Sequence, residues 1–145
     1  MQLTLYTDYS LRVLMFLAEK GGRSTIREIA EFHAISKNHL TKVVHHLGKL
    51  GYLKTTKGKG GGIALAKNPS TFKLSDVVKT LEPGFTLVEC FDPATNKCKI
   101  SLTCKLRYVL NHALGSFMRT LEEYTLADIV RAGSGSPPQK PVPAK

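Results

Sequence analysis

The stretch SKNHLTKVVHHLGKL, residues 36–50, decides how this chain folds. Ser36 is expected to cap a helix whose apolar residues recur at helical spacing on one face, namely Leu40, Val43, Val44, Leu47 and Leu50. The opposite face carries hydrogen-bond donors and no negative charge, at Asn38, Lys42, His45 and Lys49. A helix of this kind can read base edges and phosphates in the major groove of DNA.

Two shorter helical patterns precede this one. We expect the first helix to begin at Asp8, with Thr7 as its cap, and to bury a face made of Leu11, Leu14, Met15 and Leu17. A second short helix, opened by Ser24 or Thr25, runs through Phe32 and buries Ile26, Ile29 and Ala30. Because only three residues then lead into the next helix, the sequence predicts a helix-turn-helix.

Two short strand-like runs follow, at residues 52–56 and 63–66, joined by the loop KGKGGG. They predict a β-hairpin with a glycine-rich tip, which after a helix-turn-helix is a wing. Gly60 would allow close backbone approach to DNA, and Lys57 and Lys59 would enter a minor groove or clamp phosphates. The predicted fold class is mainly α with a small β-hairpin wing: a winged helix-turn-helix followed by a long C-terminal dimerisation helix.

The positive charge of the chain is concentrated in the same region. The formal net charge is +10, and residues 32–75 hold eight lysines and four of the five histidines but no Asp or Glu. Such a surface attracts a polyanion, whereas a merely solvated lysine-rich face is usually short. No catalytic constellation is present, so we expect a DNA-binding protein and not an enzyme. The expected DNA contacts are Ser36, Lys37, Asn38, His39 and Lys42 on the helix and Lys57, Lys59 and Gly60 in the wing.

All three cysteines fall in one 15-residue stretch, as Cys90-x7-Cys98-x5-Cys104. Three thiolates on one loop can bind a soft metal centre and leave one position for a weaker ligand, which suits a sensor. The spacing alone also allows buried core thiols, a zinc site or redox thiols. We expect reduced thiols in a cytoplasmic protein, because no signal peptide is visible and no apolar run is long enough to cross a membrane.

Beyond the cysteines, an apolar stripe at helical spacing extends over about five turns, through Leu106, Val109, Leu110, Ala113, Leu114, Phe117, Leu121 and Tyr124. One such face could cover the N-terminal domain. The stripe is longer than a small winged domain needs, so we expect a homodimer contact instead. A dimer would pair two recognition helices on operator DNA with two-fold symmetry.

Changes in composition divide the chain into four parts. We expect a winged helix-turn-helix DNA-binding domain at 1–83, a cysteine cluster-binding loop at 84–104 and a dimerisation helix with a C-terminal segment at 105–131. Residues 132–145 form a tail rich in Pro, Gly and Ser. We expect this tail to be disordered, because it cannot bury enough surface to repay its ordering entropy.

Short motifs recur in a fixed order along the chain: MQLT at 1–4, TDY at 7–9 with LR at 11–12, KNHL at 37–40 with Lys42, LGY at 50–52, GK at 58–59 with GGI at 61–63, DVV at 76–78, LEP at 81–83, LV at 87–88 and YTLAD at 124–128. In this order they resemble the Rrf2 family of winged-helix, iron-sulfur transcription regulators, and within it the repressors that sense nitric oxide. The resemblance covers about residues 1–131.

This resemblance implies that Cys90, Cys98 and Cys104 ligate an iron-sulfur cluster, 4Fe-4S in preference to 2Fe-2S, and that nitrosylation of the cluster releases DNA. Regulators of iron-sulfur biogenesis, the alternative within the family, carry a histidine shortly after the third cysteine, and residues 105–108 contain none. The wing departs from the family at Lys57, where Arg is usual, which weakens the expected insertion into a minor groove.

The resemblance further implies a fourth ligand, Asp8, donated by the partner subunit. Oxygen is a weak ligand for soft iron and would give a diatomic gas a point of entry. Asp8 can instead be a helix-terminal anion paired with Arg12, and Glu89 and Asp92 are competing ligands. Two alternatives stand beside this reading of the chain: a DNA-binding protein that uses its cysteines for zinc or thiol redox sensing, and a protein-interaction module whose basic charge is incidental.

Overall fold

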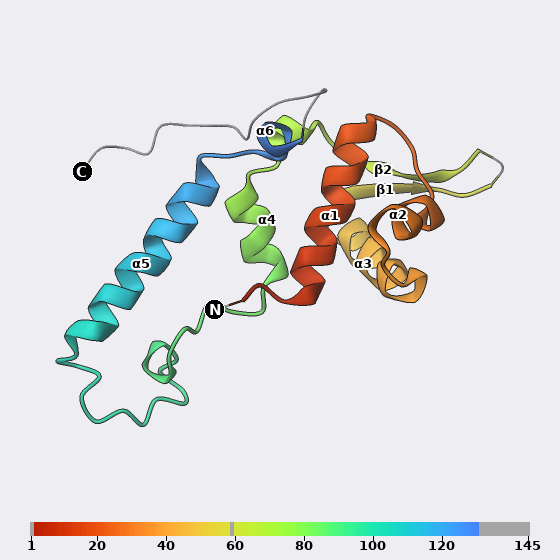
Figure 1. The fold of residues 1–145 in the computed structure, drawn as a ribbon. Coiled ribbons are helices and arrows are strands. Elements are labelled where there is room, and N and C mark those ends of the chain that lie inside the picture. Colours follow the sequence, from red (N-terminus) through yellow and green to blue (C-terminus); the bar gives the residue numbers. More distant parts are fainter. Residues whose placement is uncertain (1, 59, 131–145) are drawn as a thin grey trace.

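A computed structural model describes residues 2–58 and 60–130 (Figure 1). The protein is mainly helical with a two-stranded antiparallel sheet, which confirms the predicted fold class. In chain order the elements are α1 (Leu5–Lys20), α2 (Ile26–His33), α3 (Lys37–Lys49), β1 (Leu53–Thr56), β2 (Gly62–Leu65), the 3₁₀ turn η1 (Pro69–Thr71), α4 (Leu74–Leu81), the 3₁₀ turn η2 (Glu89–Phe91), α5 (Lys105–Glu122) and α6 (Leu126–Ile129).

Helix α1 begins at Leu5 and not at Asp8, so the prediction of Thr7 as its cap is wrong. Thr4 is the cap, and its hydroxyl oxygen accepts a hydrogen bond from the Thr7 N–H at 3.2 Å. Thr7 is fully buried inside the first turn. The helix ends at Gly21, whose φ of 66° is the left-handed conformation that glycine adopts at helix ends.

Helices α2 and α3 form the predicted helix-turn-helix. Thr25 and Glu28 cap α2 reciprocally, each side chain accepting a hydrogen bond from the other residue's N–H, at 3.2 and 2.8 Å. Ala34, at a φ of 53°, turns the chain toward α3. Ser36 occupies the cap position of α3 as predicted, although its side chain makes no capping hydrogen bond.

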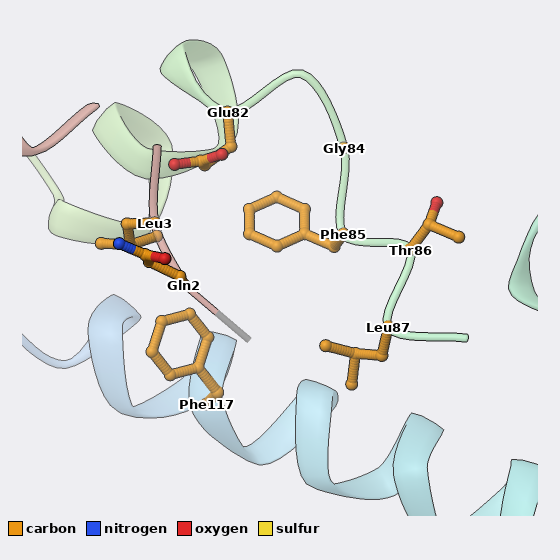
Figure 2. A pocket seen from close by; sticks show the side chains of 8 residues that line it. All are labelled: Gln2, Leu3, Glu82, Gly84, Phe85, Thr86, Leu87 and Phe117. Atoms are coloured by element: carbon orange, nitrogen blue, oxygen red, sulfur yellow. The ribbon is translucent and has the colours of Figure 1, made fainter. Parts of the chain in front are cut away.

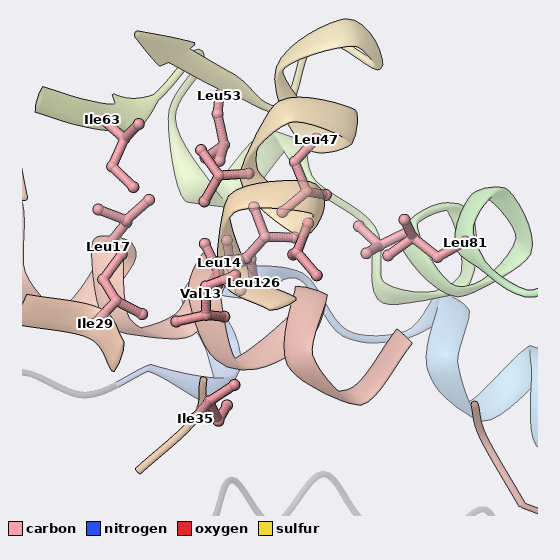
Figure 3. Close-up of a cluster of buried hydrophobic side chains, with 14 of the residues drawn as sticks. Val13, Leu14, Leu17, Ile29, Ile35, Leu47, Leu53, Ile63, Leu81 and Leu126 are labelled. Carbon is pink, nitrogen blue, oxygen red and sulfur yellow. The ribbon is translucent and has the colours of Figure 1, made fainter. Parts of the chain in front are cut away.

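The core lies where α1, α2, α3 and the hairpin meet (Figure 3). The stripe predicted on α3 is confirmed at Leu40, Val43, Val44 and Leu47. It is wrong at Leu50, which is 38% exposed because it follows the last turn of the helix. On α1 the fully buried apolar residues are Val13, Leu14 and Leu17, whereas the predicted Leu11 and Met15 are partly buried.

The predicted wing is present as an antiparallel hairpin, in which Leu53 pairs with Leu65 and Thr56 with Gly62. Leu53 and Ile63 are buried in the core, while the rest of β1 is exposed. The hairpin is therefore fixed at its base and projects into solvent at its tip (Figure 1).

Helix α4 links the winged region to the cysteine loop. The carboxylate of Glu82, which follows α4, accepts a hydrogen bond from the Thr4 N–H at 2.7 Å. The cysteine loop, residues 84–104, contains η2 and leads into α5, which packs against α4 and extends away from the wing (Figure 1). Along the whole of α5 no residue is fully buried, and Leu106 and Val109 are 62% and 57% exposed.

Helix α6 brings the chain back to the winged region. The Leu126 side chain is fully buried in the core, and its N–H donates to the Phe72 carbonyl at 2.8 Å. The Leu74 N–H donates to the Tyr124 carbonyl at 3.0 Å. The C-terminal end of α5 is thus attached to the winged region. The predicted tail at 132–145 lies outside the described residues, and no described helix is long and apolar enough to span a membrane.

Candidate functional site

The N-terminal half of α3 presents its predicted DNA contacts to solvent. Because the buried residues of α3 face α1 and α2, the residues between them point outward. The exposed side chains are those of Ser36, Lys37, Asn38, His39 and Lys42. Farther along α3, His45 and Lys49 are exposed as well. The outward face is therefore polar and free of carboxylates, as the sequence predicted.

Helix α1 holds α3 through two polar aromatic contacts. The Tyr6 hydroxyl and His46 Nδ1 are 2.7 Å apart, and burial raises the pKa of the Tyr6 phenol. The Tyr9 ring lies near the His39 ring, with centroids 6.3 Å apart. The start of α1, which also carries Asp8, therefore contacts the recognition helix directly.

In the wing, Lys57 and Gly60 are exposed, and Gly60 has a φ of 80°. The predicted contact Lys59 lies outside the described residues. The neighbouring glycines serve packing within the protein: a Cβ on Gly61 would lie 2.3 Å from the Thr56 carbonyl oxygen, and one on Gly62 would lie 2.8 Å from the Ser24 carbonyl oxygen.

The segment before α2 supports the wing, which sequence reasoning missed. Ser24 exchanges two backbone hydrogen bonds with Ile63, at 2.9 and 2.8 Å. The Arg23 guanidinium donates to the Gly60 carbonyl at 3.4 Å. The pairing of residue 24 with residue 63 depends on the tertiary fold, so no local sequence pattern predicts it.

The three cysteines are free thiols, with Cys90 buried and Cys98 and Cys104 partly buried. Cys104 lies at the cap position of α5, where its sulfur accepts a hydrogen bond from the Arg107 N–H at 3.4 Å. The Arg107 guanidinium donates to the Ser101 carbonyl at 3.2 Å. Cys104 and Arg107 therefore fix the end of the cysteine loop to the first turn of α5.

The structure does not gather the predicted ligands into one centre: in residues 2–58 and 60–130, no three His, Cys, Asp or Glu side chains lie close enough together to hold a metal ion. The competing carboxylates in the loop already have partners. Glu89 accepts from the Lys97 N–H at 2.5 Å, and Asp92 accepts from the Ala94 N–H at 2.9 Å. Their side chains shape the loop.

Asp8 lies in the first turn of α1 and forms an ion pair with Arg12, with the Arg12 Nη2 and Asp8 Oδ2 atoms 2.9 Å apart. This is the arrangement that the sequence allowed as the alternative to a ligand role. The pair is partly exposed, with side-chain exposures of 45% and 38% for Arg12 and Asp8. An exposed pair of this kind is weak, so it can open at small cost.

A hollow of about 480 Å³ lies beside the start of the cysteine loop (Figure 2). The N-terminal residues Gln2 and Leu3 form one wall, and the rings of Phe85 and Phe117 face each other across the opening (Figure 2). The hollow is therefore bordered by the segment before α1, the start of the cysteine loop and α5.

The helix-turn-helix presents a face of hydrogen-bond donors on α3, and a β-hairpin follows it. This arrangement defines a winged-helix DNA-binding domain. Residues 3–132 match the Rrf2 family, whose description is "Iron-dependent Transcriptional regulator". The chain belongs to this family, which confirms the resemblance seen in the sequence motifs.

Curated relatives are similar over nearly their whole length. The chain is 51% identical over 133 residues to the HTH-type transcriptional regulator NsrR of Bacillus subtilis, a match that covers 90% of this chain and 91% of that protein. It is 49% identical over 132 residues to the regulator of the same name from Shouchella clausii, covering 90% and 89% of the two chains. The protein is therefore a DNA-binding transcriptional regulator, and these relatives are named as regulators and not as enzymes.

Solved structures share the fold. A transcriptional regulator from Listeria innocua aligns with a TM-score of 0.75 at 22% identity, covering 100% of this chain and 96% of that one. CymR, the global cysteine regulator of B. subtilis, aligns with a TM-score of 0.69 at 23% identity, covering 88% and 95%. At these identities the likeness concerns the arrangement of the helices and the wing.

Proposed function

We propose that this protein is a homodimeric repressor that binds two-fold symmetric operator DNA and releases it in response to nitric oxide. Cys90, Cys98 and Cys104 would hold an iron-sulfur cluster, preferably 4Fe-4S, with Asp8 of the partner subunit as fourth ligand. The observation that carries the proposal is the presence of three free thiols on one loop that directly follows the winged region. The role is regulatory and not enzymatic, and DNA together with reduced thiols assigns it to the cytoplasm.

The chemistry of the loop suits an anionic cluster. Residues 93–121 contain no Asp or Glu. In the sequence, the last two cysteines are flanked by four basic residues, namely Lys97, Lys99, Lys105 and Arg107. Positive charge lowers the free energy of thiolates and of the cluster that they bind. Such a cluster, when bound, supplies iron atoms that react with nitric oxide.

The dimer is supported by the uncovered face of α5. Leu106, Tyr108 and Val109 are more than half exposed, although the stripe to which Leu106 and Val109 belong is apolar over its length. Apolar surface of this extent is usually buried against another chain. A second copy of α5 would cover it and would set the spacing of two recognition helices.

A route from the ligand position to DNA lies within α1. Asp8 is two residues from Tyr6, whose hydroxyl contacts His46 of α3 at 2.7 Å. If Asp8 is held by the partner subunit, the helix that positions α3 is held as well. Release of Asp8 to its ion pair with Arg12 would let α1 and α3 change position together. The two DNA-binding domains of the dimer would then lose the spacing that the operator requires, and the protein would dissociate from DNA.

The test begins with protein purified without oxygen. We expect iron, acid-labile sulfide and a visible absorption band, all lost in Cys90→Ala, Cys98→Ala and Cys104→Ala. Nitric oxide should abolish binding to an operator selected from a random duplex library by the untreated protein. Colourless protein with stoichiometric zinc would instead support the zinc-dependent alternative.

The partner ligand needs its own test. Asp8→Ala should give a more labile cluster and altered nitric-oxide kinetics, whereas Asp8→Cys should hold the cluster more tightly. Asp76→Ala is the matched control, because Asp76 is also an acidic residue in the first turn of a helix. A dimer of one Asp8→Ala chain and one Cys98→Ala chain should contain one intact site and one that lacks both ligands. Equal behaviour of Asp8→Ala and Asp76→Ala would remove Asp8 from the ligand set.

A further inference from the structure

We propose that Arg23 is a DNA-contacting residue of the wing, and that its guanidinium binds a backbone phosphate where the hairpin meets the duplex. The inference rests on operator binding as proposed above. It extends the DNA-binding surface from α3 and the hairpin tip to the segment between α1 and α2, which the sequence motifs did not include.

The position of Arg23 is the first argument. The segment between α1 and α2 runs beside the strands of the wing (Figure 1), where Ser24 exchanges its two backbone hydrogen bonds with Ile63. The Arg23 guanidinium reaches the Gly60 carbonyl at the hairpin tip, at 3.4 Å. Arg23 thus adds its charge to the part of the wing that carries Lys57.

The packing of the segment is the second argument. The Cβ that a larger residue would place on Gly62 would lie 2.8 Å from the Ser24 carbonyl oxygen and 3.6 Å from the Arg23 Cβ. Backbone therefore lies directly on backbone here, with no side chain between the two segments. Because the contact is so close, Arg23 is held at a fixed place along the hairpin.

The unused hydrogen-bond donors of the Arg23 guanidinium are the third argument. Within the described residues, Arg12 and Arg27 each form an ion pair with a carboxylate, and Arg23 forms none. Its contact with Gly60, at the long end of the hydrogen-bond range, uses one of five N–H donors. An exposed guanidinium with unused donors matches a phosphate, which it can bind through two parallel hydrogen bonds.

A purely structural role makes a different prediction. If Arg23 only supports the hairpin, the hydrogen bond to Gly60 matters and the charge does not. Arg23→Gln keeps a side-chain N–H donor but removes the charge, whereas Arg23→Lys keeps the charge. Arg27→Gln is the control, because Arg27 is an exposed arginine of α2 already paired with Glu31 at 2.7 Å.

The experiment measures binding of the anaerobically purified full-length dimer to the selected operator duplex, by fluorescence anisotropy from 50 to 200 mM salt. We expect Arg23→Gln to lower the magnitude of the salt slope by about 1, so that its deficit in affinity is roughly 3- to 4-fold larger at 50 mM than at 200 mM. Arg23→Lys should recover most of the slope, and Arg27→Gln should match the wild type.

Three outcomes would overturn the inference: Arg23→Gln with the wild-type slope and affinity, Arg23→Gln with weaker binding but an unchanged slope, or an equal loss of slope in Arg27→Gln. Circular dichroism and thermal unfolding of each variant check that the fold is intact. Failure of the wild-type protein to bind any selected duplex would instead contradict the proposed function, so the two failures are distinguishable.

Discussion

Gly61 and Gly48 differ in the space available for a side chain. At Gly61 a methyl group would lie 2.3 Å from the Thr56 carbonyl oxygen, whereas at Gly48, near the end of α3, it would meet no atom within 4 Å. Gly61→Ala should distort the wing and weaken operator binding. Gly48→Ala should raise the free energy of unfolding by about 0.5–1 kcal/mol, because glycine is a poor helix former. Urea unfolding and anisotropy titrations of both variants check these outcomes, and equal effects would contradict them.

His33 should make stability depend on pH. Its Nε2 atom is buried without a hydrogen-bond partner among the described residues, and burial, followed by the charge of Arg12, lowers its pKa. The unfolded chain takes up this proton near pH 6.5, above the pH at which the folded protein does. The free energy of unfolding therefore falls as the pH drops below that value. His33→Leu should flatten the change between pH 7.5 and 5.5 in urea unfolding, and a change as large as that of the wild type would contradict this role of His33.

The start of α1 depends on one hydroxyl. Thr4 caps the helix and also donates its N–H to Glu82, so a single residue joins α1 to the end of α4. Thr4→Ala should lower the free energy of unfolding by about 1 kcal/mol, the usual cost of losing an N-cap. Thr4→Ser retains the hydroxyl and should unfold within about 0.5 kcal/mol of the wild type. A Thr4→Ala protein as stable as Thr4→Ser would show that the cap contributes nothing.

We expect the exposed apolar face of α5 to pack against α5 of a second copy of the chain. Leu106→Lys combined with Val109→Lys places two charges on its exposed apolar face. This variant should sediment as a monomer and bind the operator weakly, because a monomer engages only one half-site. Helical content should be retained, since neither side chain is buried in the chain itself. Asn111→Lys, an exposed position of the same helix, should remain dimeric in the same sedimentation experiment.

Among the described residues, the buried core begins at Val13 in the sequence, and its last buried member is Leu126. This side chain is fully buried among residues of the winged region. Leu126→Ala should therefore cost about 2–5 kcal/mol, as expected for a cavity in a closed core. The control is Leu121→Ala on α5, which is only partly buried and should cost less. Equal losses in urea unfolding would show that α6 does not complete the core.

Sequence periodicity predicted the secondary structure and the burial that depend on residues close together in the chain. The buried face of α3, its exposed donors and the hairpin follow from spacing and turn residues within a few positions. Contacts between distant segments could not be predicted in this way. The choice of Thr4 over Thr7 involves Glu82, the support of the wing involves Ser24 and Ile63, and Leu126 is assigned to the core only by the fold. The cysteine motif was found in the sequence and Asp8 through the family resemblance, but their proposed joint use requires a second chain, which the sequence of one chain does not position.

A ribosome synthesises a chain from its N-terminus, so Leu126, the last buried residue of the core in the sequence, is added after the whole cysteine loop. Synthesis advances at about 5–20 residues per second, so roughly 2–9 s separate residue 83 from residue 126. All three cysteines are made within that interval. All three cysteines are therefore synthesised before the winged region receives its last buried core residue, so folding of that region is completed only after the whole cysteine loop has been made.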